Sequence, residues 1–268
     1  MTRTVVITGS TRGIGLGMAN AFLARGCSVM ISGRTKEDVD RATAVLRQQY
    51  PRQNISGYPC DVQDPGQVES LWRKAVSDFE HVDVWINNAG VSGDQQVISE
   101  SPPAQAESIV KTNLLGVIYG SQVAARGMIE QGHGSIYNME GMGSDGRMHE
   151  GLVLYGMTKY GVCYFTRGLA KEISNSPIIV GSIRPGMVVT DLIIRQYEGR
   201  PEEWKRAKRI FNIIADRVEV VAPGLVDQVL KNNRNGVHLS RSTGWRMLFR
   251  LIAQPFSHRD LFEHGISS

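Results

Sequence analysis

Short apolar runs alternate with longer segments of helical periodicity along most of this chain, and this alternation constrains its fold more than any other feature. The short runs are rich in β-branched residues, as strands are, and the longer segments repeat their apolar residues at helical spacing. Strands separated by helices imply βαβ units, in which parallel strands build a sheet and helices cover both faces. We therefore predict an α/β fold with a parallel sheet.

The expected strands are Val5–Thr8, Ser28–Ser32, Ile55–Cys60, Val82–Asn87, Gly134–Asn138, Ile178–Ile183 and Val237–Ser240. The expected helices are Gly13–Arg25, Glu37–Gln49, Pro65–Phe79, Ala104–Gln131, Leu152–Ser174, one or two within Thr190–Ala215, and Gly224–Lys231. No repeat or low-complexity linker interrupts this order. Residues 1–240 are therefore expected to form one domain, with residues 241–268 as its C-terminal tail.

Composition and charge exclude several classes of function. The net charge of +4 is modest, and no concentrated basic patch is present, so nucleic acid is not an expected partner. The three cysteines, Cys27, Cys60 and Cys163, lie far apart in apolar contexts and are expected to be reduced core residues. The six histidines show no pairing at metal-ligand spacing, so no metal site is expected.

The two ends of the chain bear on its location. The first strand begins at once, with no signal peptide, transit peptide or apolar stretch of ~18 residues, so a cytoplasmic protein, or one peripheral to a membrane, is expected. In the tail, apolar residues fall at helical spacing. They either dock on the protein body or a partner subunit, or form an amphipathic helix that touches a membrane or an apolar substrate. These residues are Trp245, Leu248, Phe249, Ile252 and Phe256.

A glycine-rich turn follows the first strand and opens the first helix. Its sequence is Thr8-Gly9-Ser10-Thr11-Arg12-Gly13-Ile14-Gly15. Glycines permit a tight turn and the close approach of a diphosphate, and the helix adds free N–H groups and the positive end of its dipole. An ordinary βα turn is the alternative. The strand–turn–helix context favours a dinucleotide site.

The end of the second strand indicates which dinucleotide binds. Proteins that choose NAD usually place a carboxylate there to hold the ribose 2′-hydroxyl, whereas this chain has Ser32-Gly33-Arg34. Arg34 and Arg12 are either ordinary surface arginines or a clamp for a 2′-phosphate, which guanidinium groups bind well. Their presence at both diagnostic places predicts NADPH as the cofactor.

Tyr155 and Lys159 are spaced by one helical turn in the run Tyr155-Gly-Met-Thr-Lys159. Residues at this spacing share one face of a helix, although such pairs also occur by chance. An unperturbed phenol titrates near ~10, and a nearby ammonium is expected to lower its pKa toward the range of a proton shuttle.

Several spaced motifs agree in order with those of the short-chain dehydrogenases/reductases, which the chain resembles from Thr4 to about residue 240. The motifs are Thr8–Gly15, Cys60-Asp61-Val62, Asn87-Asn88-Ala89-Gly90, Asn113, Tyr155-x-x-x-Lys159 and Pro185-Gly186-x-x-x-Thr190. The resemblance implies a Rossmann-type doubly wound sheet of about seven parallel strands, with the cofactor at their carboxyl ends. It also implies a homo-oligomer formed through the helices Ala104–Gln131 and Leu152–Ser174.

The same resemblance assigns roles to residues. Tyr155 is the acid that protonates the substrate oxygen as hydride arrives, Lys159 tunes it and binds the ribose, and Asn113 holds a proton-relay water. Asp61 and Val62 correspond to the adenine contact. The remaining cofactor-binding positions are Gly9, Ser10, Thr11, Arg12, Gly13, Ile14, Gly15, Arg34, Asn88, Ala89, Gly90, Pro185, Gly186, Val188 and Thr190.

The chain departs from the family where a serine normally hydrogen-bonds the substrate carbonyl. Gly141 occupies that place, with Glu140 before it. Three interpretations follow. The protein is a non-catalytic dinucleotide-binding module, or Ser144 substitutes through a rearranged loop, or Tyr155 and a backbone N–H polarise the carbonyl alone. Losing one oxyanion donor costs roughly two or three decades in rate without abolishing turnover.

The segment around this departure is similar to the plant chlorophyll b reductases, which carry an acidic residue and glycine at the same places. The similar segments are Asn138–Arg147, Trp85–Gly90 and Pro185–Asp191. This resemblance implies NADPH-dependent reduction of the 7-formyl group of chlorophyll b to hydroxymethyl, near photosynthetic membranes. We expect the glycine to leave room for a flat macrocycle. The alternative substrate is another aldehyde or ketone.

Overall fold

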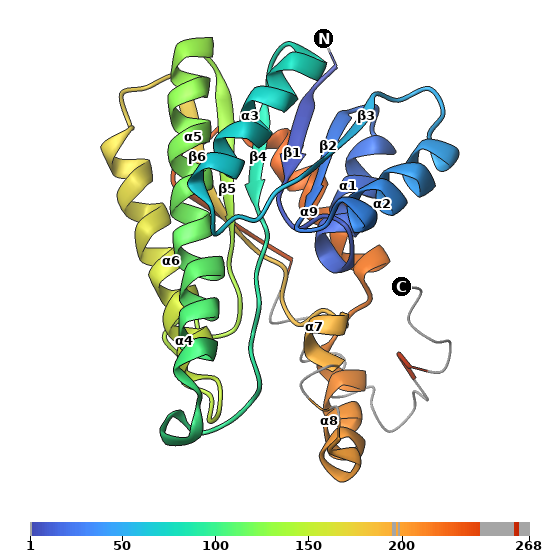
Figure 1. Cartoon of the computed structure of the whole chain (residues 1–268), viewed down its shortest axis with the longest axis vertical. Helices are drawn as coiled ribbons and strands as arrows, with labels where there is room; N and C mark the ends of the chain where they lie inside the picture. Colours follow the sequence, from blue (N-terminus) through green and yellow to red (C-terminus); the bar gives the residue numbers. More distant parts are fainter. Residues whose placement is uncertain (1, 195–196, 198, 242–259, 263–268) are drawn as a thin grey trace.

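Seven strands form one parallel sheet in the computed structural model, which describes residues 2–194, 197, 199–241 and 260–262 (Figure 1). The strands are β1 (Thr4–Ile7), β2 (Ser28–Gly33), β3 (Ile55–Pro59), β4 (Val84–Asn87), β5 (Gly134–Met139), β6 (Ile178–Arg184) and β7 (Val237–Ser240). Their order is β3-β2-β1-β4-β5-β6-β7. The order reverses between β1 and β4, and that point, at the carboxyl ends of the strands, is where doubly wound sheets bind their ligands.

Helices cover both faces of the sheet (Figure 1). One face carries α1 (Gly13–Leu23), α2 (Lys36–Gln49) and α9 (Val218–Lys231), and the other carries α3 (Pro65–Phe79), α5 (Gly116–Gln131) and α6 (Val153–Glu172). The remaining helical elements are η1 (Ile98–Glu100), α4 (Pro103–Val110), η2 (Lys111–Leu115), α7 (Asp191–Ile194) and α8 (Pro201–Ile214). Each face buries its own apolar core, because both sides of a parallel sheet are covered. The predicted α/β fold is confirmed.

Most predicted elements agree with the structure within the usual uncertainty of element ends. The predicted helix Gly224–Lys231 is wrong at its start, because α9 already begins at Val218 and contains Pro223. A proline removes one helical hydrogen bond, but the buried Val221 and Ala222 pack in the core that α9 shares with α1. The predicted helix Ala104–Gln131 is α4, a π-helical turn η2 and α5 in succession.

Two buried asparagines connect the sheet to α6. Asn87 ends β4 and its Nδ2 donates to Asn138 Oδ1 of β5 at 2.8 Å. Asn138 Nδ2 in turn donates to Thr166 Oγ1 of α6 at 3.0 Å. Buried polar groups that satisfy one another specify one arrangement. These bonds therefore fix the position of α6 beside the carboxyl ends of β4 and β5.

Helices α7 and α8 lie beyond the carboxyl ends of the strands (Figure 1). Tyr197, Trp204, Phe211 and Phe262 pack there as an aromatic cluster, with ring centroids of Trp204 and Phe262 4.9 Å apart. Most of the charges predicted to face solvent on α8 do so. The cluster adds an apolar layer beside the edge where the ligand of such a sheet binds.

The tail residues 242–259, which include the expected amphipathic helix, lie outside the described residues. No described helix is both long and apolar enough to cross a membrane. All three cysteines are free thiols buried within the protein, as predicted.

Candidate active site

The glycine turn is held against β4 by one side chain. Asn88 Nδ2 donates to the carbonyl oxygens of Thr8 and Gly9 at 2.9 and 3.0 Å. Gly9 and Gly13 have φ of +62° and +56°, a backbone conformation that favours glycine. A Cβ at Gly15 would collide with the Asn88 amide. The turn thus requires its glycines for conformation and for close packing.

The groups around this turn fit a dinucleotide. Helix α1 has no side-chain cap, and the N–H groups of Gly13, Ile14 and Gly15 have no partner among the described residues. These N–H groups and the helix dipole suit a diphosphate. Two buried oxygens nearby, Ser32 Oγ and Asn88 Oδ1, also lack a hydrogen-bond partner in the described structure. Such orphaned atoms are expected where a polar ligand belongs.

Arg12 and Arg34 flank the same place, and both are exposed. A hydrogen bond from Thr35 lowers the pKa of Asp38 at the start of α2, and the charges of Arg41 and Arg12 add to this effect. Arg12 therefore lies near the N-terminus of α2, another favourable place for a phosphate. The Thr11 side chain packs over Gly33 and fills the space that a Cβ there would need.

The other predicted cofactor-binding segments meet at this edge of the sheet. Asp61 follows the buried Cys60 just after β3, and its Oδ1 accepts a hydrogen bond from Gln63 N at 3.0 Å, while Val62 is buried. After β6, Gly186 has φ of +80°, and the Thr190 side chain lies near Gly13. Among the remaining positions, Ala89 packs on Gly9, and Gly90 lies beside Lys159. Pro185 directly follows β6, and Val188 pairs with Asp216.

Tyr155 and Lys159 lie one turn apart on α6, beside the ends of β4 and β5. The Lys159 ammonium is 5.7 Å from the centroid of the Tyr155 ring. It donates a hydrogen bond to the Met139 carbonyl at 3.1 Å and is almost fully buried. Lys159 also lies beside Gly90, which follows the Ala89 that packs on Gly9 of the glycine turn.

The protonation of the pair differs from the prediction. Burial raises the pKa of Tyr155 to about 12, and the Lys159 charge does not offset that rise. Burial lowers the pKa of Lys159 to about 8, although the charge of Glu140 opposes that change. The expected lowering of the Tyr155 pKa is therefore wrong for this structure, because the effect of burial outweighs that of the ammonium. At pH 7 the phenol is protonated and the lysine is mostly charged.

Asn113 lies within the π-helical turn η2 and is completely buried. Its Oδ1 accepts a hydrogen bond from Val91 N, and its Nδ2 donates to Val91 O, both at 2.8 Å. Nδ2 also donates to Thr158 Oγ1 at 3.2 Å. The Asn113 side chain therefore fastens the loop after β4 to α6. Its predicted role as a holder of a relay water stays a prediction.

Gly141 does not leave an open space. A Cβ at Gly141 would collide with the Tyr155 hydroxyl, and it would also lie 3.2 Å from Lys159 Cγ. The expectation of room for a macrocycle at this position is therefore wrong, because the phenol itself lies against the glycine.

Ser144 is also unable to serve as the missing donor. Its hydroxyl donates to the Gly141 carbonyl at 2.7 Å and accepts from Arg184 Nη2 at 2.9 Å. A hydroxyl has a single proton to donate, and this one is used within the loop. Of the three interpretations, substitution by Ser144 is excluded in this conformation.

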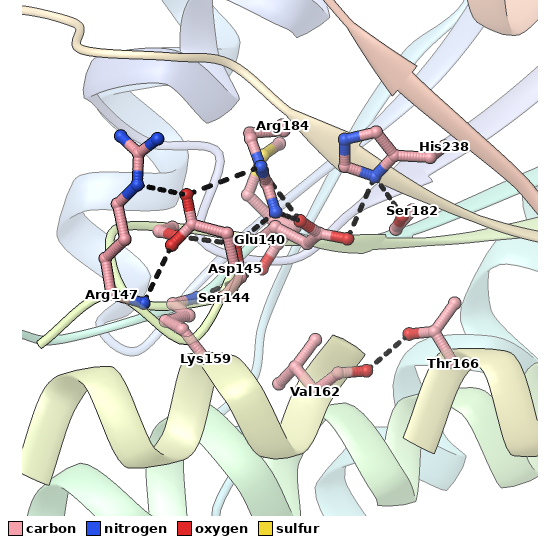
Figure 2. A network of polar contacts seen from close by, with 12 residues as sticks. Glu140, Ser144, Asp145, Arg147, Lys159, Val162, Thr166, Ser182, Arg184 and His238 are labelled. Carbon is pink, nitrogen blue, oxygen red and sulfur yellow. Dashed lines mark hydrogen bonds and ion pairs between the residues drawn. The ribbon is translucent and has the colours of Figure 1, made fainter. Parts of the chain in front are cut away.

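Glu140, the residue before Gly141, belongs to a network of polar contacts with Arg184 and His238 (Figure 2). The side chain of Glu140 is 0% exposed. Its Oε2 accepts from Arg184 Nε at 2.9 Å, and its Oε1 lies 3.1 Å from His238 Nδ1, which also contacts Ser182 Oγ. Burial raises the pKa of Glu140, but a hydrogen bond from Ser182 and the neighbouring His238 and Arg184 hold it below the ordinary value.

This network was not among the residues predicted from the sequence, although the sequence carries a signal for it. Glu140 directly follows the apolar run that becomes β5, and Arg184 ends the run that becomes β6. These two strands are neighbours, and Met139 pairs with Ile183 in their register. Opposite charges at the same end of neighbouring strands are expected to pair. His238 could not be found in this way, because its strand was predicted without a position in the sheet.

The fold and the site together define a dinucleotide-dependent α/β protein, and comparison with known proteins gives its family. The model of the short chain dehydrogenase family matches residues 3–200. A single-residue variant of actinorhodin polyketide ketoreductase, solved with NADPH, superposes with a TM-score of 0.81 at 27% identity, covering 91% of this chain and 97% of the other. The chain belongs to the short-chain dehydrogenase family.

Two curated relatives carry a more specific name. Chlorophyll(ide) b reductase NOL of Arabidopsis thaliana is 34% identical over 230 residues, which is 84% of this chain and 64% of the relative. The probable chlorophyll(ide) b reductase NYC1 of the same plant is 33% identical over 266 residues, which is 93% of this chain and 52% of the relative. The chain thus spans between half and two thirds of the length of these relatives.

We predict that Glu140→Gln destabilises the fold by about 3 kcal/mol at pH 7, because it leaves the Arg184 charge without its buried partner. Urea unfolding measures this, with Glu219→Gln on the exposed side of α9 as the control. The pKa of Glu140 is held down in the folded state, so its stabilisation is present above the unfolded pKa and disappears as the pH falls. The difference from wild type should therefore shrink below about pH 4. A loss no larger than that of the control contradicts the prediction.

Proposed function

We propose that this protein is an NADPH-dependent reductase that converts a carbonyl group on a bulky substrate to an alcohol, with the formyl group of chlorophyll b as the leading candidate. The observation that carries this proposal is the protonated phenol of Tyr155, one helical turn from a buried ammonium, in a fold whose glycine turn is suited to a diphosphate. This arrangement combines a proton donor with a dinucleotide site.

NADPH is the proposed cofactor for two reasons. A relative of the same family was solved with NADPH. In addition, β2 ends in Ser32-Gly33 followed by Arg34, with no carboxylate to hold a free 2′-hydroxyl. Arg34 and Arg12 are the residues proposed to hold the 2′-phosphate, because guanidinium groups match its geometry.

The residues of this chain divide the chemistry with the cofactor. When bound, NADPH supplies a hydride to the carbonyl carbon. Tyr155 donates its proton to the carbonyl oxygen, so that one hydride and one proton complete the alcohol. Lys159 stabilises the phenolate that remains, because an ammonium favours the charged form of a nearby phenol. Asn113 keeps the loop around Val91 in place beside this pair.

The proposed substrate rests on the two plant relatives and on the surroundings of the site. Both relatives are named for reduction of chlorophyll(ide) b. The aromatic cluster of Tyr197, Trp204, Phe211 and Phe262 lies beyond the strand ends, where its rings would suit contact with a large apolar ring system. The macrocycle would then lie toward that cluster, since Tyr155 occupies the space at Gly141.

A second candidate function is a dinucleotide-binding module without catalysis. Gly141 supplies no side-chain donor, and the Ser144 hydroxyl is used within its own loop. A site with one donor alone would bind the cofactor and reduce its substrate slowly or not at all. The two candidates differ in whether NADPH is oxidised.

We also propose that the protein is a homo-oligomer. Val153, Met157, Tyr160 and Tyr164 form a stripe on one face of α6, and each is between 51% and 79% exposed. Exposed apolar residues gathered along one helix are typical of a protein–protein interface, whereas single ones are ordinary.

The first prediction of this proposal concerns turnover. Purified protein given NADPH and chlorophyll b or chlorophyllide b should form the hydroxymethyl pigment, measured by chromatography. Tyr155→Phe should lower kcat by at least about a hundredfold, because the proton donor is lost, while NADPH still binds. Absence of hydroxymethyl product would contradict the substrate. If a panel of other aldehydes and ketones also fails to oxidise NADPH, the binding module is favoured.

Cofactor choice gives another prediction. Arg34→Ala should weaken NADPH binding roughly tenfold to a hundredfold, because a charged hydrogen bond to the 2′-phosphate is lost. NADH binding should change little, since NADH lacks that phosphate. Fluorescence titration measures both affinities, and Arg52→Ala, another exposed arginine, is the control. Equal losses for the two nucleotides would argue against the clamp.

Self-association can be measured by analytical ultracentrifugation. Tyr164→Glu should shift the protein toward monomer, because it places a charge in the proposed apolar interface. Val45→Glu on α2 is the matched control, since Val45 is exposed to 57% but lies away from α6. A wild-type monomer at micromolar concentration would refute the proposed oligomer.

A further inference from the structure

The segment after β5 forms a tight turn that packs directly on α6. Ser144 N donates to the Gly141 carbonyl at 3.1 Å, which closes a four-residue turn with Met142 and Gly143 at its centre. Gly143 has φ of +91°, while Met142 is not in the positive-φ region, so the pattern is that of a type II turn. Cβ atoms at Gly141 and Gly143 would collide with Tyr155 and Gly156 respectively. The turn therefore lies against α6 on both sides of Met142.

The direction of one peptide group in this turn is fixed. The Gly141 carbonyl accepts two hydrogen bonds from Ser144, one from its N–H and one from its hydroxyl at 2.7 Å. Ser144 is held in turn by Arg184, and Arg184 by the buried Glu140 (Figure 2). In a trans peptide the C=O and the following N–H point in opposite directions. The N–H of Met142 therefore points away from Ser144, out of the turn.

This N–H is unused by the protein. Within residues 2–194, 197, 199–241 and 260–262, no acceptor for Met142 N–H is found. Met142 is also only half-buried. The Gly141 N–H is likewise without a partner in the described residues, but only the Met142 N–H has its direction set by the bonds of the turn. Met142 directly follows Gly141, and the Tyr155 hydroxyl lies against Gly141.

We propose that the backbone N–H of Met142 is the second hydrogen-bond donor to the substrate carbonyl oxygen. It takes the role of the serine side chain that is missing at Gly141. This inference rests on the proposed reductase function and names the group that completes its site. Tyr155 gives its proton to the oxygen, and the Met142 N–H donates to the same oxygen as negative charge develops. Preorganised backbone donors of this kind act strongly in sites that exclude water. Glu140, Arg184 and Ser144 are then positioning residues that aim this donor.

The test compares Met142→Pro with Met142→Ala. Proline removes the N–H, and it is well suited to the second position of a type II turn, so the turn itself should persist. We expect Met142→Pro to lower kcat by roughly a hundredfold to a thousandfold, with NADPH affinity and thermal stability close to those of Met142→Ala. The alanine variant loses the same side chain but keeps the N–H, so its kcat is the reference against which the proline variant is compared. Equal kcat values for the two variants would overturn the proposal.

A second variant covers the case in which the proline protein does not fold. Ser144→Ala removes the hydroxyl that fixes the Gly141 carbonyl and should lower kcat about tenfold, without changing the affinity for NADPH. A wild-type kcat for Ser144→Ala would then overturn the proposal. If wild-type protein reduces no carbonyl compound, the proposed function fails by itself. In that case the Met142 N–H is tested by titrating chlorophyllide b into protein loaded with NADP⁺. Equal affinities of the Met142→Pro and Met142→Ala variants for chlorophyllide b would overturn the proposal.

Discussion

A buried carboxylate is stable only when its charge is balanced, and Glu140 meets this condition at the end of β5. Arg184 from β6 supplies the balancing charge and His238 from β7 adds a polar contact, so one side chain links three neighbouring strands. The same arginine holds Ser144, and Ser144 holds the turn that lies against Tyr155. The geometry of the site therefore depends on a charge pair that need not touch any ligand.

Burial has opposite effects on the two central side chains of α6. It raises the pKa of Tyr155 and lowers that of Lys159, and Glu140 limits the second change. The result at neutral pH is a neutral phenol beside a mostly charged ammonium. This is a suitable resting state for proton donation, because the Tyr155 phenol is protonated. The Lys159 ammonium, which stabilises the phenolate, is already present.

The sequence was sufficient for the sheet, its helices and the residues that gather at its carboxyl edge, because alternating periodicity and spaced motifs are local signals. It was insufficient for α9, where buried Val221 and Ala222 outweigh the effect of Pro223. It also gave the wrong sign for the Tyr155 pKa, since burial depends on packing that the spacing from Lys159 does not report. The space at Gly141 was misjudged for the same reason, because only the folded chain brings the Tyr155 hydroxyl to that glycine.

The contact between Gly141 and Tyr155 has a consequence for how such a site can change over evolutionary time. A serine at Gly141 would meet the phenol, so gaining the usual side chain requires Tyr155 to move first. The turn is held by the bonds from Arg184 to Ser144 and to Glu140, so the phenol is the group that has to shift before a side chain fits at this position. A serine introduced at Gly141 is therefore expected to displace the proposed proton donor.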